Sequence, residues 1–363
     1  MRSAVVCAVL VCACQQKQQD AAARAQPARR DLTATLGPVS RAALGDLDGD
    51  GRLELVTVGS RQVLVTDATS GRQIAAAPVT AGIQVLVVAD IDGDHRAEIV
   101  AGWGMTREFR AAGARISRLS LADGRLVEET IAEPETERDD IAAIVPMPDR
   151  KALLVAYFDA KYTVTSAIAR RGAAGWQLDT IGSIRMATSY ARGDLDGDGT
   201  PELVVGRAYG DALGLDGDAF VLAADGRRTP LPTTRGLRSL AIAGGDVFVG
   251  DGWHQNYATN ARGLLTWIRR TPAGFRAQLI EDTQGQYAIE RIVPATIDGK
   301  QALVTLGNRY VRVFVRDGDS WRGLTIGGAA RDIAVGDIDG VPGDEIVIAG
   351  DTSEVVDLHG VRW

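Results

Sequence analysis

Four short acidic segments have residue types and spacing suited to holding a hard cation. In the first, DLDGDGRLE, carboxylates occupy positions 1, 3, 5 and 9, and glycines occupy positions 4 and 6. Calcium is bound by roughly six to eight oxygens at short range, and closely spaced carboxylates on a tight turn provide several of them. The first segment therefore predicts ligation by the side chains of Asp46, Asp48, Asp50 and Glu54 and by the backbone carbonyl of Arg52.

Two further segments repeat this spacing without gaps. The second has His95 at the position where glycine is preferred, so we expect weaker binding there, whereas the third is complete. The predicted ligands are Asp90, Asp92, Asp94, Arg96 and Glu98 in the second segment, and Asp194, Asp196, Asp198, Thr200 and Glu202 in the third, with Arg96 and Thr200 acting through their carbonyls.

The fourth segment is a doubtful ion site. It keeps Asp337, Asp339 and Glu345 but has Val341 at the fifth position and Pro342 next. An alternative for all four segments is a hydrogen-bonded acidic turn without metal. An EF-hand is not indicated, because its last carboxylate stands at position 12 before a helix, whereas position 9 here opens an apolar, strand-like run.

The acidic segments belong to an internal repeat. Their first aspartates are spaced at close to one, two and three multiples of about 48 residues, which predicts further copies in the gaps. Degenerate copies that keep the apolar runs but lose the acidic residues begin at Ile141, Leu240 and Ile292. The sequence therefore contains seven repeats.

Each repeat has the pattern of four short strands, which is typical of one blade of a β-propeller. The last repeat supplies only three strands, and RRDLTATLGP (residues 29–38) resembles the missing fourth. We therefore predict an all-β fold, a seven-bladed β-propeller over residues 31–363, closed by an N-terminal strand in the last blade. An eight-bladed ring or two smaller domains are the alternatives.

These repeats resemble FG-GAP/VCBS repeats, which occur in integrin α-subunit propellers and in many bacterial secreted proteins. The resemblance implies a structural calcium ion on the face where the first and second strands of a blade join, with partner binding on the opposite face. It implies adhesion or interaction without identifying the partner. The family more usually has aspartate at position 9, where Glu54, Glu98 and Glu202 stand here.

Composition excludes several functions. The formal net charge of −7 repels nucleic acid and anionic lipid. None of the three histidines has zinc-like spacing with cysteine or another histidine, and no nucleophile elbow, phosphate-binding loop or dinucleotide fingerprint is present. Catalysis therefore has no direct support in the sequence.

Long connections between second and third strands carry aromatic and polar residues suited to sugars or peptides. These connections begin at Gly102, Gly206 and Gly250 and are expected on the face opposite the acidic segments. The alternative is that they are self-packed covers. The candidate ligand-face residues are Trp103, Arg107, Tyr209, Trp253, His254, Asn256 and Tyr257.

The N-terminus has the layout of a bacterial secretion signal. Arg2 precedes a short apolar run that ends in VCAC, which resembles a lipobox with Cys14 as the lipidated residue. We expect a lipoprotein signal over residues 1–13 and a polar tether over 14–30, with Gln15 favouring the outer membrane. An ordinary cleaved signal and free secretion is the alternative.

These observations predict a non-catalytic, calcium-binding interaction or adhesion module at the bacterial cell envelope. Calcium is expected to be structural, and the partner is a protein or glycan. The first alternative is a propeller enzyme, a lyase or hydrolase that acts on polysaccharide through the aromatic loop face. The second is a scaffold within an envelope complex.

Overall fold

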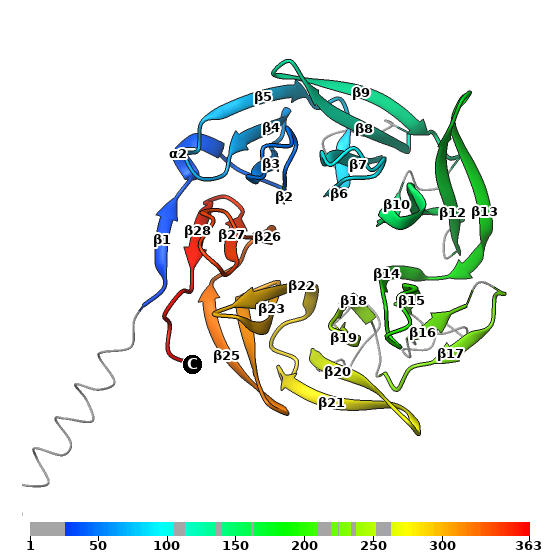
Figure 1. The fold of residues 1–363 in the computed structure, drawn as a ribbon, viewed down its shortest axis with the longest axis vertical. Helices are drawn as coiled ribbons and strands as arrows, with labels where there is room; N and C mark the ends of the chain where they lie inside the picture. The colour runs from blue at the N-terminus through cyan, green and yellow to red at the C-terminus, as the bar shows by residue number, and fades with distance from the viewer. Residues whose placement is uncertain are drawn as a thin grey trace, which may run out of the picture.

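Short runs of alternating apolar residues, separated by Gly and Asp turns, form strands throughout the described chain. The computed structural model describes residues 26–104, 113–135, 140–160, 163–208, 219–223, 225–233, 237–251 and 263–363. Its strands make seven four-stranded antiparallel sheets arranged radially in a ring (Figure 1). The predicted seven-bladed propeller is confirmed.

The first three blades follow one another along the chain, each running from its inner strand outwards (Figure 1). The first blade consists of β2 (Arg41–Gly45), β3 (Glu54–Val58), β4 (Gln62–Asp67) and β5 (Gln73–Pro78). The second consists of β6 (Gly82–Ala89), β7 (Glu98–Gly104), β8 (Arg115–Ala122) and β9 (Arg125–Ala132). The third consists of β10 (Ile141–Met147), β11 (Ala152–Ala160), β12 (Thr163–Gly172) and β13 (Gly175–Arg185), with a 3-10 turn, η1 (Pro148–Arg150), between its first two strands.

The next three blades repeat this order. The fourth consists of β14 (Ala187–Gly193), β15 (Glu202–Arg207), β16 (Ala219–Leu222) and β17 (Arg228–Pro230). The fifth consists of β18 (Leu237–Ala243), β19 (Asp246–Asp251), β20 (Leu264–Thr271) and β21 (Gly274–Asp282). The sixth consists of β22 (Ile289–Ile297), β23 (Lys300–Gly307), β24 (Val311–Asp317) and β25 (Ser320–Gly327). Three of the seven blades, the third, fifth and sixth, are the degenerate repeats, so the apolar pattern specifies a blade without the acidic loop.

The seventh blade joins the two ends of the described chain. It consists of β26 (Asp332–Gly336), β27 (Glu345–Ala349), β28 (Glu354–Asp357) and the N-terminal strand β1 (Ala28–Asp31). Arg30 pairs with Val355, and β1 lies along the outer side of β28 in Figure 1. Closure by an N-terminal strand is confirmed, and it covers an edge that would otherwise be exposed.

The closing strand is shorter than the sequence indicated. Only its first residues pair, and Thr33–Leu36 form a helical turn, α2. The Asp31 carboxylate accepts a hydrogen bond from the Thr33 amide at 2.8 Å, and the Leu36 amide donates to the Leu32 carbonyl at 3.0 Å. Because Leu32 is buried and Gly37 has a φ of 64°, the chain turns inward instead of continuing along the blade.

The core lies between neighbouring blades. The second strands β3, β7 and β27 are buried along their whole length because they are covered on both faces, whereas the outer strands β9 and β25 are largely exposed or half-buried. One cluster joins Val56 and Val65 of the first blade to Ile83 and Trp103 of the second. In the described residues, no helix has the length and apolar character needed to cross a membrane.

Candidate functional site

The four acidic segments lie on one face of the ring. Each connects the inner strand of a blade to its second strand: β2 to β3, β6 to β7, β14 to β15 and β26 to β27. Because these inner strands run in the same direction through the ring, the four connections emerge on the same side. We refer to them as the first (residues 46–54), second (90–98), third (194–202) and fourth (337–345) acidic loops.

The first acidic loop is wound around its leading aspartate. The Asp46 carboxylate accepts hydrogen bonds from the amides of Gly49 at 2.7 Å and Gly51 at 2.9 Å. Gly51 has a φ of 86°, a conformation that favours glycine and lets the chain turn back. The turn brings one oxygen each of Asp46, Asp48 and Asp50 within 4.8 Å of one another, close enough to share a cation.

The glutamate at position nine anchors each loop to the following strand. Glu54 Oε2 accepts a hydrogen bond from the Leu47 amide at 2.7 Å, and Glu98, Glu202 and Glu345 accept equivalent bonds from Ile91, Leu195 and Ile338. Burial, together with the charges of Asp48, Asp46 and Asp50, raises the pKa of Glu54 to about 7. A bound cation would offset this repulsion.

In the third acidic loop the leading aspartate again accepts the amides of the two loop glycines, but the carboxylates converge differently. Oxygens of Asp194, Asp196 and Glu202 lie within 4.8 Å of one another, and Asp198 is not part of this group. Arg270 of the fifth blade forms a partly exposed ion pair with Asp196 at 2.8 Å. The position-nine carboxylate thus joins the cluster here.

The fourth acidic loop also gathers three carboxylates. Asp337, Asp339 and Glu345 each place an oxygen within 4.8 Å of the others, although Val341 replaces the aspartate at position five. The Val341 amide instead donates to Asp339 at 2.8 Å. The doubtful loop therefore has fewer carboxylates but a cluster comparable in size to that of the third loop.

The second acidic loop contains a cation from the protein itself. Asp90, Asp92 and Asp94 cluster within 4.8 Å, but Arg118 of β8 extends its guanidinium to the loop. Arg118 Nη2 lies 2.6 Å from Asp92 Oδ2 and also donates to Glu98 Oε1. Burial lowers the pKa of Arg118, but the carboxylates of Glu98 and Asp92 outweigh it and raise the pKa overall, so the guanidinium stays charged. The sequence patterns did not point to Arg118.

Comparison with known families agrees with this architecture. The FG-GAP-like repeat family matches residues 46–101, which span the first and second acidic loops and the strands β3 to β6. The chain is a seven-bladed β-propeller that carries an FG-GAP-like repeat in its first two blades. No curated protein matches the chain. The acidic loops therefore gather carboxylate oxygens close enough together to hold a metal ion, and the first two of them lie within the matched repeat.

The opposite face of the propeller carries a pocket of about 370 Å³ between the fifth and sixth blades. It lies where β21 passes to β22 and where β23 passes to β24, at the blade ends remote from the acidic loops. The rings of Tyr287 and Tyr310 meet edge to face with centroids 5.4 Å apart. The residues that line the pocket are Glu281, Asp282, Thr283, Gln284, Gln286, Tyr287, Tyr310, Arg312 and Thr325.

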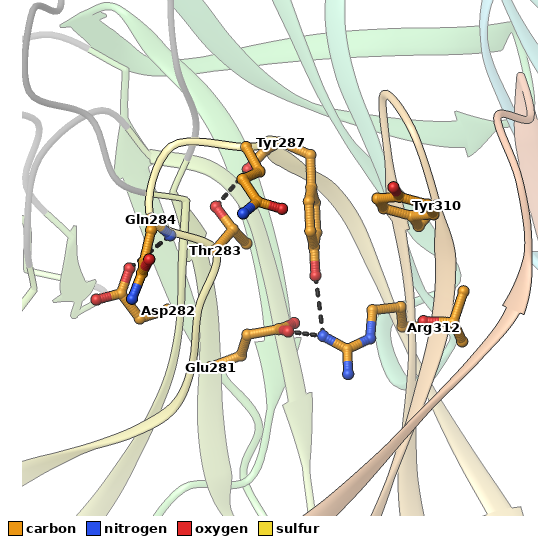
Figure 2. A pocket seen from close by; sticks show the side chains of 9 residues that line it. Glu281, Asp282, Thr283, Gln284, Tyr287, Tyr310 and Arg312 are labelled. Carbon is orange, nitrogen blue, oxygen red and sulfur yellow. Dashed lines mark hydrogen bonds and ion pairs between the residues drawn. The ribbon is translucent and has the colours of Figure 1, made fainter.

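One wall of this pocket is formed by three polar side chains that bind one another, Glu281, Arg312 and Tyr287 (Figure 2). Arg312 Nη1 donates to Tyr287 Oη at 3.0 Å and forms an ion pair with Glu281. Burial raises the pKa of Tyr287 to about 12, with a further contribution from Tyr310, so its hydroxyl stays protonated. Tyr287 is buried, whereas the Tyr310 ring is 40% exposed and available to a ligand.

The aromatic residues expected at this face differ from those observed. Trp103 is buried in the core at 1% exposure, with Arg115 stacked 4.9 Å from its ring, so its side chain is not on the surface. The other candidates lie outside the described residues, as does Cys14: Arg107, Tyr209, Trp253, His254, Asn256 and Tyr257. Tyr287, Tyr310 and Arg312 were missed because Tyr287 is more than twenty residues from the other two in the sequence.

Proposed function

We propose that this propeller is a non-catalytic interaction module that is stabilised by structural calcium on one face and binds its partner on the other. The carboxylate clusters of the first and third acidic loops support the calcium role. Calcium would be held there by Asp46, Asp48, Asp50, Asp194, Asp196 and Glu202, and its charge would offset the mutual repulsion of these side chains. The ion would join each loop to the strand that follows it.

Thermal unfolding with and without calcium tests this role. A ligand that binds only the folded state at about 100 times its Kd adds roughly 3 kcal/mol of stability per site. We therefore expect the Tm to fall by several degrees when calcium is replaced by excess chelator. Magnesium at the same concentration is the control, because it favours a smaller octahedral site and retains its water. An identical Tm in calcium and in chelator would contradict the proposal.

The pocket between the fifth and sixth blades is the part of the partner face that the geometry supports best. An exposed aromatic ring can stack on the apolar face of a sugar, while the side chains of Gln284, Gln286 and Asp282 hydrogen-bond its hydroxyls. The ordered Glu281–Arg312 ion pair fixes one wall in advance of binding, which reduces the entropy cost of association. We therefore favour a glycan as the ligand.

Glycan-array screening of the propeller in calcium tests this assignment. Tyr310→Ala should weaken binding to any glycan found by about tenfold, since an aromatic contact contributes about 1.4 kcal/mol. Ile181→Ala, which alters a residue exposed to a similar degree on an outer strand, should leave binding unchanged. Binding that survives Tyr310→Ala, or a screen in which peptides bind and glycans do not, would redirect the assignment.

The envelope location remains part of the proposal. It is supported by the apolar N-terminal run and by the lipobox-like sequence that ends at Cys14. Metabolic labelling with a fatty-acid analogue tests it, and labelling should disappear in Cys14→Ser.

A further inference from the structure

The second acidic loop differs from the other three at one structurally equivalent position. Two residues beyond the position-nine glutamate, the second strand of each blade carries a valine that pairs with a residue of the third strand. In the first, fourth and seventh blades that partner is again a valine: Val65, Val221 and Val355. In the second blade, the partner of Val100 is Arg118.

Arg118 binds the carboxylate oxygen of Glu98, the position-nine residue, that could otherwise ligate an ion. Glu98 Oε2 accepts the Ile91 amide at 3.1 Å, and Glu98 Oε1 is bound to the guanidinium. Both carboxylate oxygens are therefore occupied by groups of the protein. In the first loop, Glu54 Oε2 has the equivalent amide bond, but within the described residues Glu54 Oε1 has no hydrogen-bond donor.

The guanidinium also joins the two parts of the loop that an ion would join. Asp92 lies in the turn and Glu98 opens β7, and Arg118 Nη2 bonds to both. The Arg118 side chain is only 9% exposed, so its charge is poorly screened by solvent. A divalent cation that shared Asp92 with this guanidinium would be repelled by it.

We propose that Arg118 is a built-in replacement for calcium, so that the second acidic loop binds no ion and keeps its structure without one. This inference rests on the proposed calcium role of the first and third loops. The family repeat matches the second loop, yet the residues around it fit a guanidinium instead of a metal. Asp92 Oδ1 is buried and has no hydrogen-bond partner in the described residues. The test therefore counts the calcium ions bound per chain.

The test compares the same substitution in two loops. Asp50 and Asp94 hold the same loop position, and each accepts an amide hydrogen bond, at 2.8 and 2.9 Å, that asparagine can also accept. Isothermal titration with calcium chloride should show one ion fewer per chain in Asp50→Asn than in the wild type. Asp94→Asn should leave the number unchanged. Loss of one ion in Asp94→Asn would overturn the proposal.

A second variant tests whether the guanidinium is what excludes the ion. Arg118→Val installs the residue of the other three acidic blades and should add one calcium ion per chain. The added ion should disappear in Arg118→Val/Asp94→Asn. A folded Arg118→Val protein that gains no ion would also overturn the proposal. Failure of the calcium role itself would look different, since the wild type and Asp50→Asn would then bind equal numbers of ions.

Discussion

The first and second acidic loops have nearly the same backbone and a different source of positive charge. In both, the leading aspartate accepts amide hydrogen bonds from positions four and six, at 2.7 and 2.9 Å around Asp46 and at 2.6 and 3.0 Å around Asp90. His95 adopts a φ of 69° where the first loop has glycine. The fold of the loop is thus set by aspartate–amide bonds, whereas the residue on the neighbouring strand decides how its charge is neutralised.

The largest expected difference between the two loops is a loss in the free energy of unfolding caused by Arg118→Val in excess chelator. Removing one partner of a buried ion pair leaves the other charge uncompensated and costs about 4 kcal/mol. Urea unfolding should therefore show a loss of that order in the free energy of unfolding, and added calcium should restore part of it. Arg125→Ala, at an exposed arginine of β9, is the control and should have little effect.

A double-mutant cycle sharpens this prediction. Glu98→Gln should be destabilising in the wild type, because it weakens the pair with Arg118, but neutral or stabilising in Arg118→Val, where Glu98 is an unpaired buried carboxylate. Equal effects in the two backgrounds would show that the ion pair does not hold the second loop.

A smaller effect is expected from pH in the first loop. In excess chelator, the pKa of Glu54 is raised by burial and by the neighbouring aspartates from 4.5 to about 7. The folded state therefore binds this proton more tightly than the unfolded state, so stability should decline as pH rises from about 4.5 to about 7 and stay low above it. The shift corresponds to a loss of up to about 3 kcal/mol.

Other carboxylates contribute to the pH profile, so the measurement is the difference from Glu54→Gln. Chelated wild type and Glu54→Gln should differ most in the slope of unfolding free energy between pH 5 and pH 7, with the shallower slope in the variant. Parallel profiles for the two proteins would mean that Glu54 does not carry the excess charge of the first loop.

Most of the fold was predictable because propeller blades are local units. Six of the seven blades form from consecutive residues with a strand period and glycine turns, so the blades at Ile141, Leu240 and Ile292 could be placed despite having lost their acidic residues. The N-terminal closing strand was found by its likeness to other outer strands. Its early end at Asp31 was not, because a side-chain hydrogen bond to Thr33 and the burial of Leu32 redirect the chain.

The residues of the candidate site also fall into two groups: those that local sequence spacing predicts and those that only strand pairing brings together. The carboxylates of the acidic loops are close in sequence, so their clustering follows from local spacing. Arg118 lies 20 residues beyond Glu98, whereas Val65 lies 11 beyond Glu54, because the connection between second and third strands differs in length. The equivalence of the two positions is visible only through strand pairing. Tyr287, in the connection between β21 and β22, likewise meets Tyr310 and Arg312 of the sixth blade only through the packing of neighbouring blades.

The sequence by itself determined the repeat, the number of blades and the carboxylates of each acidic loop, because all three depend on contacts within about fifty residues. The tertiary structure decided that Arg118 pairs with the strand beside the second loop, where the other three acidic blades have a valine. It also decided which aromatic residues reach the surface and which, like Trp103, are buried between blades. Those outcomes depend on register and on packing between sheets, which one-dimensional spacing does not encode.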